Sequence, residues 1–203
     1  MSASTSIPTV GSPGSGSSGG SRASRVTVSV AELDAMPEAE AAELFASCCG
    51  ASRWVTGMVA RRPFGTRGAV LTVADRLWEK MDEPDWREAF SHHPRIGEQT
   101  GSVPQTTRGK AWSGAEQAGM DSADEGLRRE LSVVNREYEE RFGYIYIVCA
   151  EGMTAEELLA FARRRLANDP STELLTAYDQ QGKIMRLRLE KLFRTRNGTR
   201  DQT

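Results

Sequence analysis

Apolar residues recur by threes and fours along most of this chain, and this spacing constrains the fold more than any other feature. It is clearest in two sets, Leu127, Leu131, Val134, Tyr138 and Phe142, and Leu174, Tyr178, Gln181, Met185, Arg188 and Leu192. Residues spaced in this way share one face of an α-helix. Thr154 with Glu157 forms a capping-box pattern, and Asp169-Pro170 is a typical helix start. The sequence therefore predicts an all-α fold, a single compact domain of about seven or eight helices.

The helices are expected at 37–49, 51–61, 68–81, 82–91, in two pieces from 113 to 142, from 154, and at 169–194. Gly50 and Gly143 are expected to end helices. The β-like run 144–149 has no evident partner strand, so we predict a buried extended segment there. The domain is expected to cover 26–197, between a disordered Ser/Gly-rich tail at 1–25 and a flexible end at 198–203. A long loop is expected at 97–111.

Composition excludes several classes of function. With 26 basic and 28 acidic residues, the formal net charge is −2, so no basic excess favours nucleic acid. Three cysteines without a CxxC pattern indicate a reducing compartment, hence the cytoplasm, and no structural metal. Neither a membrane-spanning apolar run nor a secretory signal is evident. We therefore expect a cytoplasmic protein that binds neither nucleic acid nor membrane.

Both histidines of the chain, His92 and His93, stand directly before Pro94. Proline disfavours helical geometry in the preceding residue, so His93 is expected to leave the helix and enter an exposed turn. Histidine is the usual proton-transfer group near neutral pH. This turn is therefore the first place to look for chemistry, although a His-Pro pair can also be a plain surface turn.

Two further polar positions are candidates. Ser113 and Glu116, with Gln117 next to them, could form part of a site, but Ser113 and Glu116 also match an ordinary capping box. Arg188 lies on the mostly apolar face of the last predicted helix. A buried arginine needs an anionic partner, which could be a carboxylate-bearing ligand or a structural salt bridge.

Five segments carry a family resemblance: His92-His93-Pro94-Arg95-Ile96-Gly97-Glu98, Trp112-Ser113-Gly114-Ala115-Glu116-Gln117-Ala118-Gly119, Asn135 to Gly143, Ile147 to Ala150, and Lys183 to Leu189. Together they resemble the OHCU decarboxylase family, in which OHCU is 2-oxo-4-hydroxy-4-carboxy-5-ureidoimidazoline. They occur in the family's order, and the resemblance covers about 31–194. Each motif is weak alone, but the ordered set is fairly specific.

The resemblance implies a cofactor-independent, metal-free carboxy-lyase that forms (S)-allantoin in urate degradation. It implies that His93 and Glu116 are catalytic and that Arg188 anchors substrate oxygens. Further substrate-binding positions are implied at Pro94, Ser113, Gln117, Ile147, Val148, Cys149 and Ala150. Relatives suggest a homodimer, which no residue pattern here requires. The alternatives are a non-catalytic helical relative that binds a ligand or a partner, and a decarboxylase of a related ureido acid.

Overall fold

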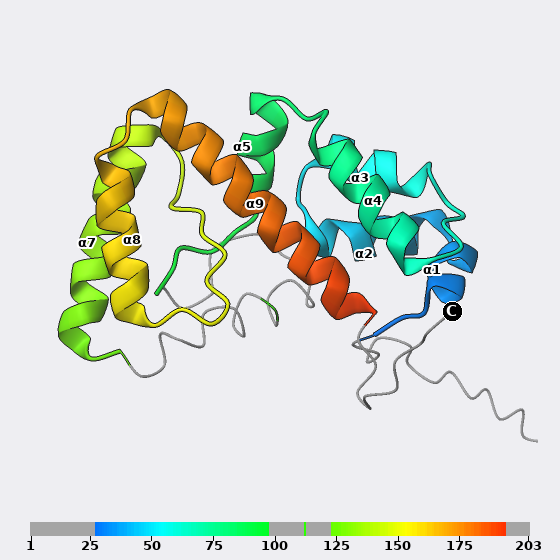
Figure 1. The fold of residues 1–203 in the computed structure, drawn as a ribbon, viewed down its shortest axis with the longest axis horizontal. Helices are drawn as coiled ribbons and strands as arrows, with labels where there is room; N and C mark the ends of the chain where they lie inside the picture. The colour runs from blue at the N-terminus through cyan, green and yellow to red at the C-terminus, as the bar shows by residue number, and fades with distance from the viewer. Residues whose placement is uncertain (1–26, 98–111, 113–122, 194–203) are drawn as a thin grey trace, which may run out of the picture.

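The computed structural model describes residues 27–97, 112 and 123–193, and every structural statement below refers to these residues. Within them the chain forms eight helices and no strand, which confirms the all-α prediction. Figure 1 shows α1 (Val30–Ala35), α2 (Glu38–Cys48), α3 (Ser52–Val59), α4 (Arg67–Trp78), α5 (Glu83–Ser91), α7 (Glu125–Phe142), α8 (Ala155–Leu166) and α9 (Pro170–Leu192).

Local capping chemistry fixes several helix ends where the sequence predicts them. Thr154 and Glu157 form the expected capping box at the start of α8, with Oε2 of Glu157 2.9 Å from the Thr154 backbone nitrogen. Asp169 is the N-cap of α9, and Pro170 takes the first helical position. The side chain of Asp169 accepts hydrogen bonds from the backbone N–H groups of Ser171 and Thr172. Gly143 ends α7 with a left-handed φ of 75°, a conformation that glycine adopts without strain.

Gly50 does not cap a helix, and that prediction is wrong. Helix α2 ends at Cys48, and its C-cap Cys49 has an extended backbone (φ −146°), so the chain leaves the helix without a left-handed residue. Gly50 is instead the point where the side chain of His92 packs against the backbone. A Cβ atom at position 50 would lie 2.4 Å from Cγ of His92. This glycine is therefore required by a contact between segments far apart in the sequence.

Helix α9 runs from the side of α7 and α8 to the side of α1–α4 (Figure 1), and it contributes side chains to two hydrophobic cores. The first core joins α1 to α4 with the C-terminal half of α9, including Met185, Leu189 and Leu192. The second core joins α7, α8 and the segment after α7 to the N-terminal half of α9. Helix α5 also connects them, because Ala89 belongs to the first core and Phe90 to the second. Side chains that α5 and α9 direct toward each other therefore lie at the junction of the cores.

The run that follows α7 is extended and buried, as predicted. Tyr146, Ile147, Val148 and Ala150 are buried in the second core, and no strand pairs with them among the described residues. No helix in the described part of the chain is long and apolar enough to cross a membrane.

Candidate active site

The His-Pro turn lies at the junction of the two cores, directly after α5. His92 is the C-cap of that helix, and the backbone N–H of His93 donates to the Phe90 carbonyl at 3.1 Å. The turn was predicted correctly, but its exposure was not: His93 is only 8% exposed and Pro94 is also buried. His92 is half-buried because its ring packs on Gly50. A buried imidazole at a chain turn is shielded from bulk water, which suits a catalytic role better than a surface one.

Helix α7 holds this turn in place from the other side. Arg95 makes two parallel contacts with Glu139, with Nε 2.9 Å from Oε2 and Nη2 3.0 Å from Oε1. The side-chain amide of Asn135 donates to the carbonyl of Ile96 at 2.8 Å. Paired charge-assisted contacts of this kind fix orientation as well as distance. The segment that carries His93 is therefore anchored at both ends, by α5 and by α7.

Helix α9 brings Arg188 to His93. Arg188 is 4% exposed, as its position on the apolar face predicts, and its Nη1 donates to the carbonyl of Ser47 at 3.3 Å. Burial lowers the pKa of His93 well below its usual range, and the charge of Arg188 lowers it further. The contact with Gln181 opposes this shift, while the neighbouring His92 adds to it. The imidazole is therefore neutral at pH 7, with one nitrogen able to accept a proton and the other able to donate one.

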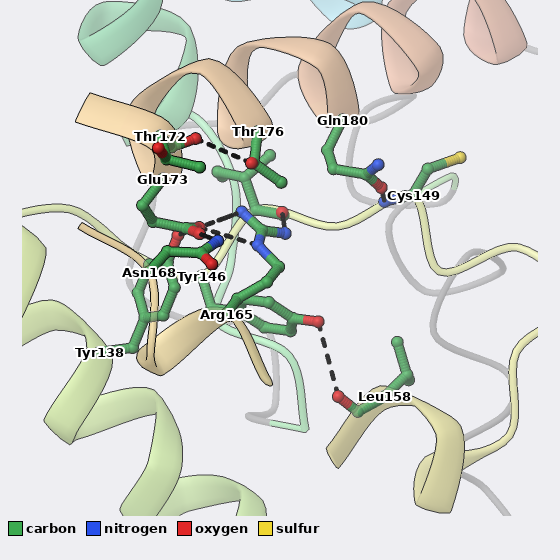
Figure 2. A network of polar contacts seen from close by, with 11 residues as sticks. Tyr138, Tyr146, Cys149, Leu158, Arg165, Asn168, Thr172, Glu173, Thr176 and Gln180 are labelled. Carbon is green, nitrogen blue, oxygen red and sulfur yellow. Dashed lines mark hydrogen bonds and ion pairs between the residues drawn. The ribbon is translucent and has the colours of Figure 1, made fainter. Parts of the chain in front are cut away.

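The extended segment Ile147–Ala150 is tied to α8 and α9 by its own backbone (Figure 2). Oε1 of Gln180 accepts a hydrogen bond from the Cys149 backbone nitrogen at 3.1 Å. Nη1 of Arg165 donates to the Ile147 carbonyl at 2.6 Å. Gln181 follows Gln180 on α9 and is buried, and its amide completes no hydrogen bond with the described residues. The predicted backbone wall is thus bonded to both α8 and α9.

A buried polar network supports this wall. Arg165 and Glu173 form an ion pair and are 2% and 0% exposed. Tyr138 donates its hydroxyl proton to Glu173, and Asn168 reaches the other carboxylate oxygen at 2.8 Å. Figure 2 shows the guanidinium of Arg165 between this carboxylate and the Tyr146 ring. Both buried charges are satisfied, which a stable low-dielectric site requires.

This network was not predicted from the sequence. The burial of Arg165 could have been predicted from its spacing, because it follows Leu158 by seven residues and Ala162 by three on the buried face of α8. An arginine in such a place must have a partner, by the argument already applied to Arg188. Nothing local identifies Glu173 as that partner, since it lies in the first turn of the next helix.

Two cysteines near the site differ in environment. Burial raises the pKa of the Cys49 thiol to about 12, although a backbone hydrogen bond to Ala51 and the charge of Arg188 oppose the shift. Cys49 is therefore a protonated, buried thiol at neutral pH and no nucleophile. Cys149 is half-buried, and its backbone N–H donates a hydrogen bond to Gln180.

The structure thus places the buried His93 and Pro94 close to Arg188, and the extended segment Ile147–Ala150 is bonded through Cys149 to Gln180 on the same helix as Arg188. Ser113, Glu116 and Gln117 lie outside the described residues. Among the described residues, no group of three His, Cys, Asp or Glu side chains could hold a metal ion.

Sequence comparison relates the chain to proteins of uric acid degradation. The family model for OHCU decarboxylase matches residues 34–190. The uric acid degradation bifunctional protein TTL of Arabidopsis thaliana is 32% identical over 146 residues, which are 72% of this chain and 45% of that protein. The 2-oxo-4-hydroxy-4-carboxy-5-ureidoimidazoline decarboxylase of Amia calva is 35% identical over 77 residues, 38% of this chain and 44% of that protein. The chain therefore spans less than half the length of these two relatives.

Structural comparison agrees with the sequence. A crystal structure of OHCU decarboxylase in the presence of (S)-allantoin has a TM-score of 0.64 and 31% identity, covering 74% of this chain and 97% of that one. A crystal structure of (S)-allantoin synthase has a TM-score of 0.60 at 17% identity, covering 82% of this chain and 54% of that one. The second likeness concerns the fold alone.

Proposed function

The chain belongs to the OHCU decarboxylase family, and on that premise we propose that it decarboxylates 2-oxo-4-hydroxy-4-carboxy-5-ureidoimidazoline to (S)-allantoin in urate degradation. One observation on this chain itself supports the proposal in addition to its family membership. A buried, neutral His93 lies beside the buried cation of Arg188, on a turn that α5 and α7 both hold. This arrangement suits an anionic substrate whose reaction needs one proton transfer.

The reaction requires the site mainly to orient the substrate and to stabilise the charge that develops on it. The substrate's name places a carboxylate and a hydroxyl on the same ring carbon. Breaking the bond from that carbon to the carboxylate releases carbon dioxide and leaves an electron pair that the ring delocalises. A proton must then reach one face of the ring, because the product is a single enantiomer. A site that fixes the carboxylate, stabilises the developing charge and supplies the proton from one side performs this reaction.

His93 and Arg188 are assigned complementary parts. Arg188 anchors substrate oxygens, and its guanidinium suits a carboxylate because two parallel N–H donors match two oxygens. His93 contacts the region of the leaving carboxylate and assists proton transfer, which a neutral imidazole performs well near pH 7. Burial of both groups strengthens these interactions, since the local dielectric is lower than that of water.

The remaining site residues complete the proposal. Pro94 and the backbone of Ile147, Val148, Cys149 and Ala150 form walls of the substrate site, supported by the Gln180 and Arg165 contacts. On the family resemblance, Glu116 binds the ureido and ring nitrogens, and Ser113 and Gln117 help to hold the substrate. The same resemblance supports a reaction without metal or organic cofactor and a homodimeric assembly. Cytoplasmic location is proposed from three cysteines that form no disulfide.

The test generates the unstable substrate in place, from urate with urate oxidase and hydroxyisourate hydrolase, and follows chiral allantoin by circular dichroism. We expect added protein to accelerate the appearance of (S)-allantoin in proportion to its concentration. Equal rates with and without the protein would refute the proposal and favour a non-catalytic relative. Acceleration with only a different ureido acid would point to a changed substrate.

A further inference from the structure

Gly50 lies in the short connection between α2 and α3, where the side chain of His92 packs against its backbone. Its neighbours Cys49 and Ala51 are 1% and 0% exposed, so the connection is itself fixed in the first core. A Cβ atom at position 50 would lie 2.4 Å from Cγ, 2.6 Å from Cβ and 2.6 Å from Cδ2 of His92. The Cβ atom of His92 is fixed to its own backbone, so a change of rotamer cannot relieve this overlap. Only a movement of the backbone at His92 can.

Two polar contacts fix α5 against the start of α3, directly after this connection. The backbone N–H and the hydroxyl of Ser52 both donate to Oε2 of Glu88 at 3.0 Å. Nη1 of Arg53 lies 2.6 Å from Oδ2 of Asp85, whose side chain is 10% exposed. Glu88 precedes His92 by four residues, so both follow the same face of α5. Helix α5 therefore cannot slide to make room for a larger side chain in the connection without breaking these contacts.

The far end of the His-Pro turn is fixed by α7, through the paired contacts of Arg95 with Glu139. The chain between Glu88 and Arg95 is thus held at both ends. A displacement of His92 must be taken up between these two anchors, where His93 is the next residue.

The end of α2 that leads into the same connection contacts Arg188. Nη1 of Arg188 donates to the carbonyl of Ser47 at 3.3 Å, three residues before Gly50. One short segment thus contacts the guanidinium with its first residue and the side chain next to His93 with its last. The placement of the imidazole relative to the guanidinium therefore depends on this segment.

We propose that Gly50 is a positioning residue: because it has no Cβ atom, it admits the side chain of residue 92 against its backbone, and this holds His93 in the orientation that the reaction needs. The proposal rests on the proposed decarboxylase function. A general acid–base group must lie within hydrogen-bond reach of the atom it serves, and a small misplacement lowers the rate strongly. The close approach requires that position 50 lacks a Cβ atom and does not require an imidazole at position 92, so His92→Gln is compatible with it.

A pair of substitutions that exchanges the space between the two positions tests this role. Gly50→Ala adds the Cβ atom, and His92→Gly removes all three atoms that this Cβ would meet. We expect Gly50→Ala to lower kcat about tenfold or more with a much smaller change in KM, because His93 moves while the contact of Arg188 with α2 stays. His92→Gly alone should change kcat much less, and the double variant should recover most of the lost kcat.

Val70→Ala is the matched control for stability. Val70 is 0% exposed in the first core, on α4, and takes part in none of the contacts above, so its truncation destabilises the fold without reaching the turn. Every variant is assayed well below its melting temperature, and Val70→Ala should keep the wild-type kcat. Equal kcat in Gly50→Ala and wild type would overturn the proposal, and so would a loss that His92→Gly does not reduce.

A graded series covers the case in which Gly50→Ala does not fold alone. In the Gly50→Ala background, His92→Ala leaves one of the three overlapping atoms, the Cβ atom, and His92→Gly leaves none. We expect kcat to be higher with glycine than with alanine at position 92. The same kcat for both double variants would refute the positioning role.

Nitrogen NMR of the imidazole follows His93 without any need for activity. The chain has two histidines, so His93 is the only one left in His92→Gly, and its ring signals are assigned directly. We expect displaced His93 signals in Gly50→Ala, unchanged signals in Val70→Ala, and agreement between the Gly50→Ala, His92→Gly double variant and His92→Gly. The same His93 signals in Gly50→Ala and wild type would overturn the proposal. A wild-type protein that accelerates nothing would instead refute the proposed function, while the NMR result would still decide whether Gly50 sets the position of His93.

Discussion

The ion pair between Arg165 and Glu173 gives the sharpest prediction about stability. Arg165→Met would leave the carboxylate of Glu173, 0% exposed, without its cation. The same change removes the donor to the Ile147 carbonyl, a contact of 2.6 Å. Breaking a buried pair from one side costs about 3–5 kcal/mol, because an uncompensated charge stays in the interior. We expect a loss of this size in the free energy of unfolding.

A matched control lies two residues earlier on the same helix. Arg163 also makes an ion pair, with Glu130 at 2.8 Å, but these side chains are 58% and 54% exposed. Exposed pairs contribute about 0–1 kcal/mol, so Arg163→Met should cost no more than that. Both variants are measured by urea unfolding followed by circular dichroism. For a slope near 2 kcal/mol/M, Arg165→Met should lower the midpoint by about 2 M, and Arg163→Met by less than about 0.5 M.

The double variant Arg165→Met with Glu173→Leu tests the cause of the loss. If the loss comes from the stranded charge, removing the carboxylate as well should restore part of the stability, so that the two single effects do not add. Equal midpoints for Arg163→Met and Arg165→Met would refute the reasoning, because burial would then not decide the cost. Strict additivity in the double variant would show that the two side chains do not interact as described.

Two further predictions concern the His-Pro turn. Gly50→Ala places a Cβ atom 2.4 Å from Cγ of His92 and should lower the free energy of unfolding by about 1–3 kcal/mol. The control Gly68→Ala, whose Cβ would have no atom within 4 Å, should not destabilise the protein. Equal melting temperatures for the two variants would contradict the contact between Gly50 and His92. Burial depresses the pKa of His93 in the folded state, so as the pH falls the unfolded chain binds the proton before the folded protein does. The free energy of unfolding should therefore decrease below the unfolded-state histidine pKa of about 6.5, by up to about 1.4 kcal/mol per pH unit. Urea unfolding between pH 7 and pH 5 should show a smaller slope in His93→Gln, and identical slopes would contradict a buried neutral imidazole.

Most of the fold was predictable from local sequence patterns, each of which spans about one turn of a helix. The capping box of Thr154 and Glu157, the Asp169-Pro170 start of α9 and the left-handed Gly143 are all local chemistry, and each is where the sequence places it. The buried face of α9 was also predictable, down to the burial of Arg188, because helical periodicity depends on spacing alone.

Tertiary contacts were not predictable in this way. Gly50 carried a helix-end signal, but the ring of His92, 42 positions later in the chain, determines its role. His93 was expected in an exposed turn, yet it is buried, on a turn that α7 contacts through Asn135 and Glu139. Glu173 stands in an ordinary acidic first helix turn, and only the packing of α8 against it makes it an ion-pair partner. Local patterns indicate which residues are buried but not which ones meet.

The buried His93, and not its neighbour His92, is proposed to perform the proton transfer. The decisive measurement is the initial rate of (S)-allantoin formation in His93→Gln and His92→Gln, each compared with wild type in the coupled circular dichroism assay. We expect a loss of about 100-fold or more for His93→Gln, the range typical of a general acid–base group, and a rate near wild type for His92→Gln. A His93→Gln protein that keeps its helical spectrum and full activity would contradict it.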